Sequence, residues 1–158
     1  MADKRPKSSV ATTKAKFPSS ASGTTSEKLP KTAYVADPMK MTPSWRFGRI
    51  QTAHPWGWHE VAIADARFVC EKLMTYEGKT WTEILVKECH WNHRMEKYRL
   101  CKAAQDRLTE LALDDLEFLV SLRLGSTQRV WGYLDHNVYN ILWWDPEHEV
   151  YPTFKKNT

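Results

Sequence analysis

The sequence predicts an α+β fold in which N-terminal helices pack on a C-terminal antiparallel β meander, preceded by a disordered tail. Three observations lead to this prediction. Apolar residues recur at helical spacing after the first third of the chain, β-rich segments separated by turn residues follow them, and the first 40 residues show neither pattern. The length of 158 residues fits one domain and an additional segment.

The additional segment is the N-terminal tail, residues 1–40. It is rich in Ser, Thr, Ala and Pro, and it holds eight Lys or Arg against three Asp or Glu, whereas residues 41–158 are close to neutral. A segment with so little to bury cannot offset the entropy lost on ordering. The tail is therefore predicted to be disordered, and residues 41–158 are predicted to form a single α+β domain. The tail either solubilises the domain or acts as a tether toward acidic surfaces such as RNA.

Three helices are predicted in the first part of this domain. The first ends at Gly78, which suits the left-handed position that follows a helix. The second begins with a capping box in which Thr80 and Glu83 satisfy each other's amide groups. Residues 88–94 have no clear period and are predicted to form a loop. The predicted helices cover residues 60–77, 81–87 and 98–113.

The meander is predicted after these helices, which are expected to cover one of its faces. Residues 45–50 are predicted to form a short strand or an extended arm. The turn signals Gly-Ser-Thr and Asp-His-Asn separate the main strands. The predicted strands cover residues 119–123, 129–134 and 138–144, with a short last strand at 148–151.

Composition and motifs exclude several functions. No apolar run approaches the roughly 20 residues of a membrane span, and no secretory signal is visible, so a cytoplasmic protein is expected. The odd number and wide spacing of Cys70, Cys89 and Cys101 argue against a disulfide framework. Cys89, His90, His93 and Cys101 are metal-ligand residue types, but their spacing fits no standard zinc finger, so no metal is predicted. Phosphate-binding loops and the Gly-x-Ser-x-Gly motif are absent, and no cofactor is predicted.

The predicted strand at 129–134 provides the first candidate site. Because side chains alternate along a strand, Arg129, Trp131 and Tyr133 share one face. A guanidinium can bind phosphate and aromatic rings can stack on bases, so this face suits RNA. In the alternative interpretation a helix covers the face and Trp131 is buried beneath it.

A second set of candidates follows the Asp145-Pro146 break. RNA cleavage through attack of the 2′-hydroxyl needs a base, an acid and a cation for the phosphate. His148, Tyr151 and Arg129 have the chemistry for these three roles without a metal. In the alternative interpretation His148 is a turn residue hydrogen-bonded to Asp145.

The C-terminal third also resembles a known family. The sequence Leu-Arg-Leu-Gly-Ser-Thr-Gln-Arg-Val-Trp-Gly-Tyr-Leu at 122–134, the turn that follows it and the apolar strand at 138–144 resemble the RelE/ParE/HigB-type toxin superfamily. The resemblance covers residues 108–151. It implies helices followed by an antiparallel sheet, with Arg129 as the sheet arginine and His148 and Tyr151 in a C-terminal region that cuts messenger RNA. The same block also resembles uncharacterised prophage-type small proteins that end in Asp-Pro-x-His.

Two classes of function follow from the sequence. The first is a toxin-type RNA endonuclease that acts on RNA or at the ribosome, with Arg129, His148 and Tyr151 as catalytic residues. The second is a non-enzymatic interaction module, an antitoxin-like or immunity-like partner of another protein. The predicted RNA-binding residues are Arg123, Trp131 and Tyr133.

Overall fold

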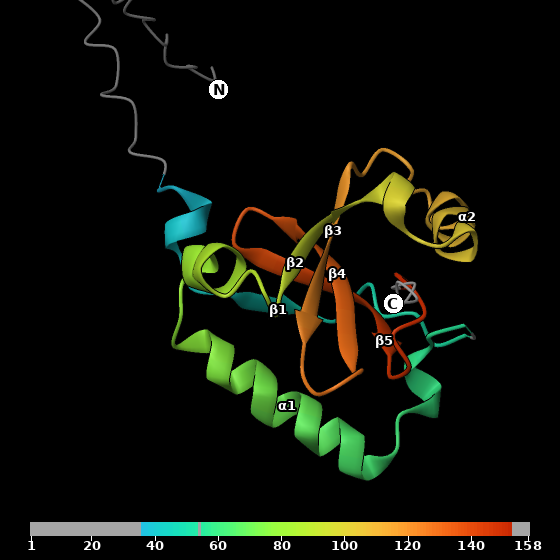
Figure 1. Ribbon diagram of the computed structural model, residues 1–158, viewed down its shortest axis with the longest axis horizontal. Helices are drawn as coiled ribbons and strands as arrows, with labels where there is room; N and C mark the ends of the chain where they lie inside the picture. The colour runs from blue at the N-terminus through green and yellow to red at the C-terminus, as the bar shows by residue number, and fades with distance from the viewer. Residues whose placement is uncertain (1–35, 54, 153–158) are drawn as a thin grey trace, which may run out of the picture. The chain divides into compact units, whose positions relative to one another are not determined.

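The fold is α+β, as the sequence predicts, with helices around a five-stranded mixed sheet (Figure 1). The computed structural model describes residues 36–53 and 55–152. The strands are β1 (Ser44–Arg46), β2 (His93–Glu96), β3 (Phe118–Arg123), β4 (Arg129–Asp135) and β5 (Val138–Asp145). The main helices are α1 (Ile63–Glu77) and α2 (Lys102–Glu110), and the short helical segments are η1 (Pro38–Lys40), η2 (Trp58–Glu60), η3 (Glu83–Lys87) and η4 (Lys97–Arg99).

The sheet has the strand order β1-β5-β4-β3-β2. β1 runs parallel to β5, and every other pair of neighbours is antiparallel. The predicted meander is present as β3, β4 and β5. The chain does not place all its helices before all its strands, however, because β1 precedes α1 and β2 lies between α1 and α2. β2 occupies part of the segment 88–94 that was expected to be a loop.

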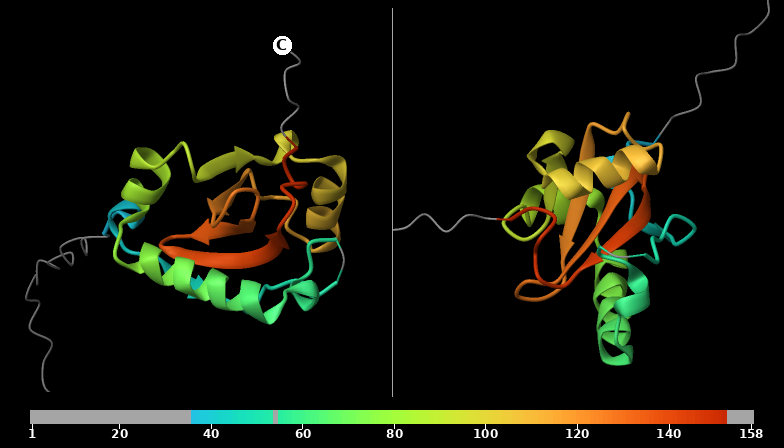
Figure 2. Two further views of the ribbon diagram at one scale, coloured as in Figure 1. Left: turned by 60° about the horizontal axis from the view of Figure 1, so that its bottom comes forward. Right: turned by 90° about the vertical axis from the view of Figure 1, so that its right-hand side faces the viewer.

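Helices cover both faces of the sheet, not the single face that was expected. α1 and η3 pack on one face with Val120, Val130 and Ile141. α2 packs on the other face with Leu119 and Trp131. The reason lies in β5, where every residue from Tyr139 to Asp145 is buried, because a strand that is apolar on both sides needs a cover on both sides. Figure 2 shows α1 and α2 as separate helices around the sheet.

The helical predictions are confirmed in part. The capping box is present: the Thr80 amide donates to Glu83 Oε2 at 2.9 Å, and the Glu83 amide donates to Thr80 Oγ1 at 3.3 Å. Gly78 follows α1, but its φ of −81° is not left-handed. The third predicted helix is divided, because the chain is extended at Cys101, whose amide donates to Val150 O at 2.9 Å.

The folded part begins before residue 41. η1 lies within the range predicted as tail, and Met39 packs against the core on the α1 face. Thr82 Oγ1 donates to the Met39 carbonyl oxygen at 2.8 Å, which ties η1 to the start of the second helical region. The predicted disorder of residues 1–35 lies outside the described residues. Among the described residues, no helix is long and apolar enough to cross a membrane.

Candidate functional site

Strand register gathers ionisable side chains at one end of the sheet, on the α2 face. Arg129 pairs with Arg123 of β3 on one side and with Asp145 of β5 on the other. Directly opposed residues of antiparallel strands point to the same face, so these three side chains form one row. His93 pairs with Ser121, two residues from Arg123, and belongs to the next row of that face. We call Arg123, Arg129, His93 and His148 the basic cluster.

Arg129 lies at the centre of the basic cluster. Its side chain is enclosed, with 7% of the residue exposed. One terminal nitrogen donates to the carbonyl oxygens of Gln128 at 3.0 Å, Ser126 at 3.3 Å and Gly125 at 3.4 Å. The Nε atom is buried and has no hydrogen-bond partner among the described residues. A buried donor without a partner is costly.

Asp145 faces Arg129 in the register and its charge favours the Arg129 cation, but its hydrogen bonds go to other groups. Its Oδ2 accepts from the Trp131 indole at 3.1 Å and from the Val150 amide at 3.1 Å, and its Oδ1 accepts from the Glu149 amide at 2.8 Å. No ion pair joins a carboxylate to Arg123 or Arg129 within the described residues. The row therefore keeps a positive charge.

His148 is carried by the turn that Asp145 caps. Its φ of 64° lies in the left-handed region, an uncommon conformation for a residue other than glycine. The two hydrogen bonds from Glu149 and Val150 to Asp145 hold this turn. Strained residues of this kind persist where the surroundings fix them, and they concentrate at functional sites.

The two histidines of the basic cluster share an electrostatic environment. Partial burial lowers the pKa of His148, and the positive charge of Arg129 lowers it further, while Asp145 opposes the change. Partial burial also lowers the pKa of His93, followed by the charges of Arg129, His90 and Arg123. The positive charge of Arg129 thus lowers the pKa of both imidazoles. Both rings are favoured in the neutral form near pH 7, in which they can accept a proton.

Arg123 links the basic cluster to an exposed aromatic ring. Its guanidinium carbon lies 4.3 Å from the centroid of the Trp91 ring, and its Nε donates to the Gly125 carbonyl oxygen at 2.8 Å. Trp91 remains 53% exposed. A cation over one face of an indole leaves the other face open for a second planar group.

Asn92 fixes the segment that carries Trp91 and His93. It is fully buried, and its Oδ1 accepts from the Arg123 amide at 2.9 Å and from the Tyr76 hydroxyl at 3.0 Å. Its side-chain amide donates to the Ile84 carbonyl oxygen at 3.3 Å. Because its two neighbours in the chain are exposed, burial of Asn92 holds them on the surface beside Arg123.

The structure separates the residues that the sequence grouped as one site. Arg129 and His148 lie in the same cluster, together with Arg123. The Tyr151 hydroxyl instead accepts from Arg99 at 3.0 Å, and its ring packs in the core on the α2 side. No interaction between Tyr151 and Arg129 is present among the described residues.

The predicted stacking residues of β4 are part of the core. Trp131 is 1% exposed, so base stacking on its ring is not compatible with this structure; its indole supports Asp145 instead. Tyr133 is half-buried against the α2-side core. The alternative interpretation, a covered face, describes Trp131 correctly. The reason is that α2 and the loop with Trp56 cover this face of β4, which side-chain alternation alone predicted to be exposed.

Metal-ligand residue types do not converge in the described part of the chain. Within it, no group of three or more His, Cys, Asp or Glu side chains is arranged to hold a metal ion. Cys70 and Cys89 are exposed free thiols, and Cys101 is a half-buried free thiol before α2.

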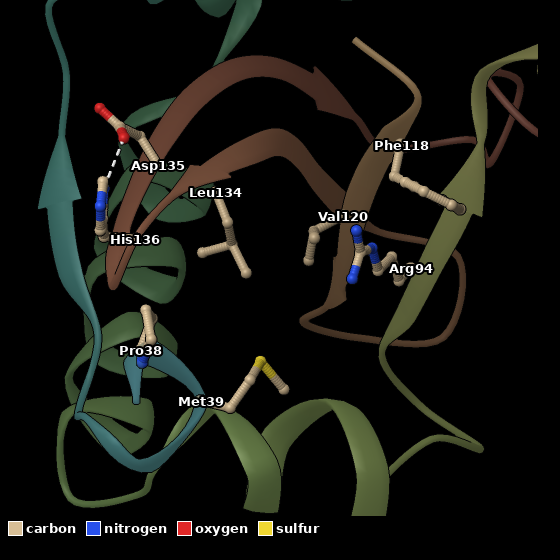
Figure 3. Close-up of a pocket in the computed structure, with 8 residues that line it drawn as sticks. All are labelled: Pro38, Met39, Arg94, Phe118, Val120, Leu134, Asp135 and His136. Atoms are coloured by element: carbon tan, nitrogen blue, oxygen red, sulfur yellow. Dashed lines mark hydrogen bonds and ion pairs between the residues drawn. The ribbon is translucent and has the colours of Figure 1, made fainter. Parts of the chain in front are cut away.

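A cavity of about 380 Å³ lies away from the basic cluster, between η1 and the sheet (Figure 3). Arg94 lies there with its guanidinium carbon 4.1 Å from the Phe118 ring centroid, and His136 bonds to Asp135 at 2.9 Å. The floor is formed by Val120 and Leu134. This cavity contains none of the residues that the sequence predicted for the site, so His136 provides a control position outside the basic cluster.

The sequence did not identify His93, Trp91 and Asn92 as members of a site. Their arrangement depends on the pairing of β2 with β3, which is not a local property of the sequence. One weak signal is present, because Trp91, His93 and Met95 lie two residues apart, as they do on one side of a strand.

Comparisons with family models, curated proteins and solved structures find no match to this chain.

Proposed function

We propose that the protein is a cytoplasmic toxin-type RNA endonuclease that cleaves RNA at the basic cluster, with side chains alone transferring the protons. The observation that carries the proposal is Arg129, which forms no carboxylate ion pair among the described residues, lies between Arg123 and Asp145 in the sheet register, and lowers the pKa of two imidazoles. A phosphodiester has the negative charge and the oxygen acceptors that a guanidinium binds most strongly.

The proposed reaction is an internal displacement at phosphorus. His148 removes the proton of the 2′-hydroxyl, and the 2′-oxygen forms a bond to phosphorus. The bond from phosphorus to the 5′-oxygen breaks, and that oxygen receives a proton from His93, which a bound phosphate helps to protonate. The products are a 2′,3′-cyclic phosphate and a 5′-hydroxyl. Arg129 and Arg123 stabilise the charge that develops on the phosphoryl oxygens.

The RelE-like character of the fold remains part of this proposal. The antiparallel order of β3, β4 and β5 and the position of Arg129 at the start of the central strand support it. Action at the ribosome and control by an antitoxin-like protein follow from the same resemblance. Tyr151 is replaced by His93 as the second proton-transfer group, since Tyr151 bonds to Arg99.

The test is cleavage of end-labelled single-stranded RNA by purified protein, with and without ribosomes. Wild type should leave 2′,3′-cyclic phosphate ends, and 2′-deoxy substitution at the cleaved nucleotide should block the reaction. His148→Ala should slow cleavage by about 10²–10⁴-fold, whereas His136→Gln, at the other end of β4, should retain the wild-type rate. If folded wild type cleaves no RNA under either condition, the proposal is wrong and the non-enzymatic interaction module becomes the better explanation.

A further inference from the structure

A second cavity shares Arg123 with the basic cluster. It has a volume of about 260 Å³ and lies between α1 and the turn that leads to β2. This is below the roughly 300–1,000 Å³ of typical sites for drug-sized ligands, so it fits one small planar or anionic group. Its principal side chains are Lys72, Lys79, Glu88, Trp91 and Arg123.

The charges of this cavity favour an anion. Lys79 forms an ion pair with Glu88, and these two charges cancel. Lys72 is exposed, and within the described residues no carboxylate pairs with it. Arg123 likewise has no carboxylate partner among the described residues, so the cavity keeps two positive charges.

The cavity also offers a flat aromatic surface. Arg123 covers one face of the Trp91 ring at 4.3 Å, and about half of the residue remains exposed. Nucleobases stack on such rings whatever their sequence, and cationic side chains follow the phosphates. Asn92, the next residue in the chain, is fully buried and accepts a hydrogen bond from the Arg123 amide, which fixes the backbone that carries Trp91 beside Arg123.

We propose that this cavity is a nucleotide subsite, in which Trp91 stacks on a base of single-stranded RNA next to the cleaved bond and Lys72 contacts its phosphate. The inference rests on the proposed function, because Arg123 belongs to both the cavity and the basic cluster. The bound strand would pass from Trp91 over Arg123 to Arg129. The ligand class is single-stranded nucleic acid, since a duplex would not expose a base to the indole.

The test is equilibrium binding of a fluorescent single-stranded 2′-deoxy oligonucleotide, which has no 2′-hydroxyl and cannot undergo the proposed cleavage. Trp91→Ala should weaken binding by about 5- to 150-fold, the range for loss of one stacking contact. Trp91→Phe should retain most of the affinity. Tyr98→Ala, which removes an exposed aromatic residue outside this cavity (72% exposed), should bind like wild type.

A salt titration tests Lys72 separately. Lys72→Ala should reduce the slope of log affinity against log salt by about one, as expected for loss of one phosphate contact. Lys102→Ala, on the surface of α2, should leave the slope unchanged.

The outcomes distinguish this inference from the proposed function. Binding that depends on Trp91 but occurs without RNA cleavage would support the subsite and contradict the endonuclease. Cleavage of RNA with unchanged affinity in folded Trp91→Ala would contradict the subsite alone. Absence of oligonucleotide binding by wild type at low salt would also overturn the subsite.

Discussion

Asp145 faces Arg129 across β4 and β5, but its carboxylate accepts hydrogen bonds from other groups. The Trp131 indole and the amides of Glu149 and Val150 use its oxygens. One buried carboxylate thus shapes the turn that carries His148, and the neighbouring guanidinium keeps its charge. Because Asp145 bonds to the turn and Arg129 has no ion-pair partner among the described residues, this end of the sheet is a candidate anion site.

Replacing Asp145 should therefore act on stability and on the site together. Asp145→Ala leaves the Trp131 indole and two amides without their acceptor, and each buried unsatisfied group costs about 1–3 kcal/mol. We expect the free energy of unfolding to fall by at least about 2 kcal/mol, measured by urea denaturation. Asp135→Ala, which removes an exposed carboxylate at the other end of β4, should change it by less than about 0.5 kcal/mol. Equal effects of the two substitutions would contradict the role of Asp145.

Asn92 provides a second prediction. Asn92→Ala removes the acceptor of the Arg123 amide and the Tyr76 hydroxyl, and the donor to Ile84. The expected loss is about 2–3 kcal/mol in the free energy of unfolding. Asn137→Ala, whose side-chain amide bonds at an exposed position, should cost less than about 1.5 kcal/mol. A cost for Asn92→Ala as small as that of the control would show that the buried network does not hold the segment.

The pH dependence of stability follows from the histidines of the basic cluster. The pKa values of His93 and His148 are lowered in the folded state, so the unfolded chain binds more protons as the pH falls below the ordinary histidine pKa of about 6.5. Their neutral forms favour folding above that pH, and this advantage is lost as the pH falls through the folded pKa values. The double variant His93→Gln/His148→Gln should lose less stability than wild type between pH 7.5 and 5, measured by urea midpoints. A double variant that follows the wild-type curve would contradict the assignment.

The start of the folded part can be tested by truncation. A chain that begins at Met41 lacks the packing of Met39 and the hydrogen bond from Thr82, whereas a chain that begins at Ala36 keeps both. The shorter chain should be less stable by about 1–2 kcal/mol, which lowers the thermal midpoint by several degrees for a domain of this size. Identical midpoints of the two chains would show that η1 contributes nothing.

Local patterns explain which parts of the fold could be predicted. The capping box at Thr80 and Glu83 and the turns between β3, β4 and β5 are encoded within a few residues, and both are present. β1 and β2 are three and four residues long and exist as strands through pairing with β5 and β3. A sequence pattern of that length does not specify such non-local partners.

The candidate site was predictable to a similar extent. Alternation along β4 correctly put Arg129 and Trp131 on one face, but it could not reveal that α2 covers the ring of Trp131. Tyr151 was grouped with His148 because both follow the Asp145-Pro146 break and both can transfer a proton. The left-handed φ of His148 and the bond from Cys101 to Val150 direct the chain toward α2 instead.

The central claim is that the basic cluster binds a phosphate group of RNA, and imidazole titration by NMR tests it most directly. In the free protein, His93 and His148 should titrate below about 6.5, since burial and the Arg129 charge lower both pKa values. Saturation with the single-stranded 2′-deoxy oligonucleotide should raise both pKa values, because the bound phosphate stabilises the imidazolium forms. Arg129→Lys keeps the charge but loses the planar donor set, so a higher oligonucleotide concentration should be needed for the same change. If the oligonucleotide binds and neither histidine pKa changes, the nucleic acid lies elsewhere on the protein and the account is wrong.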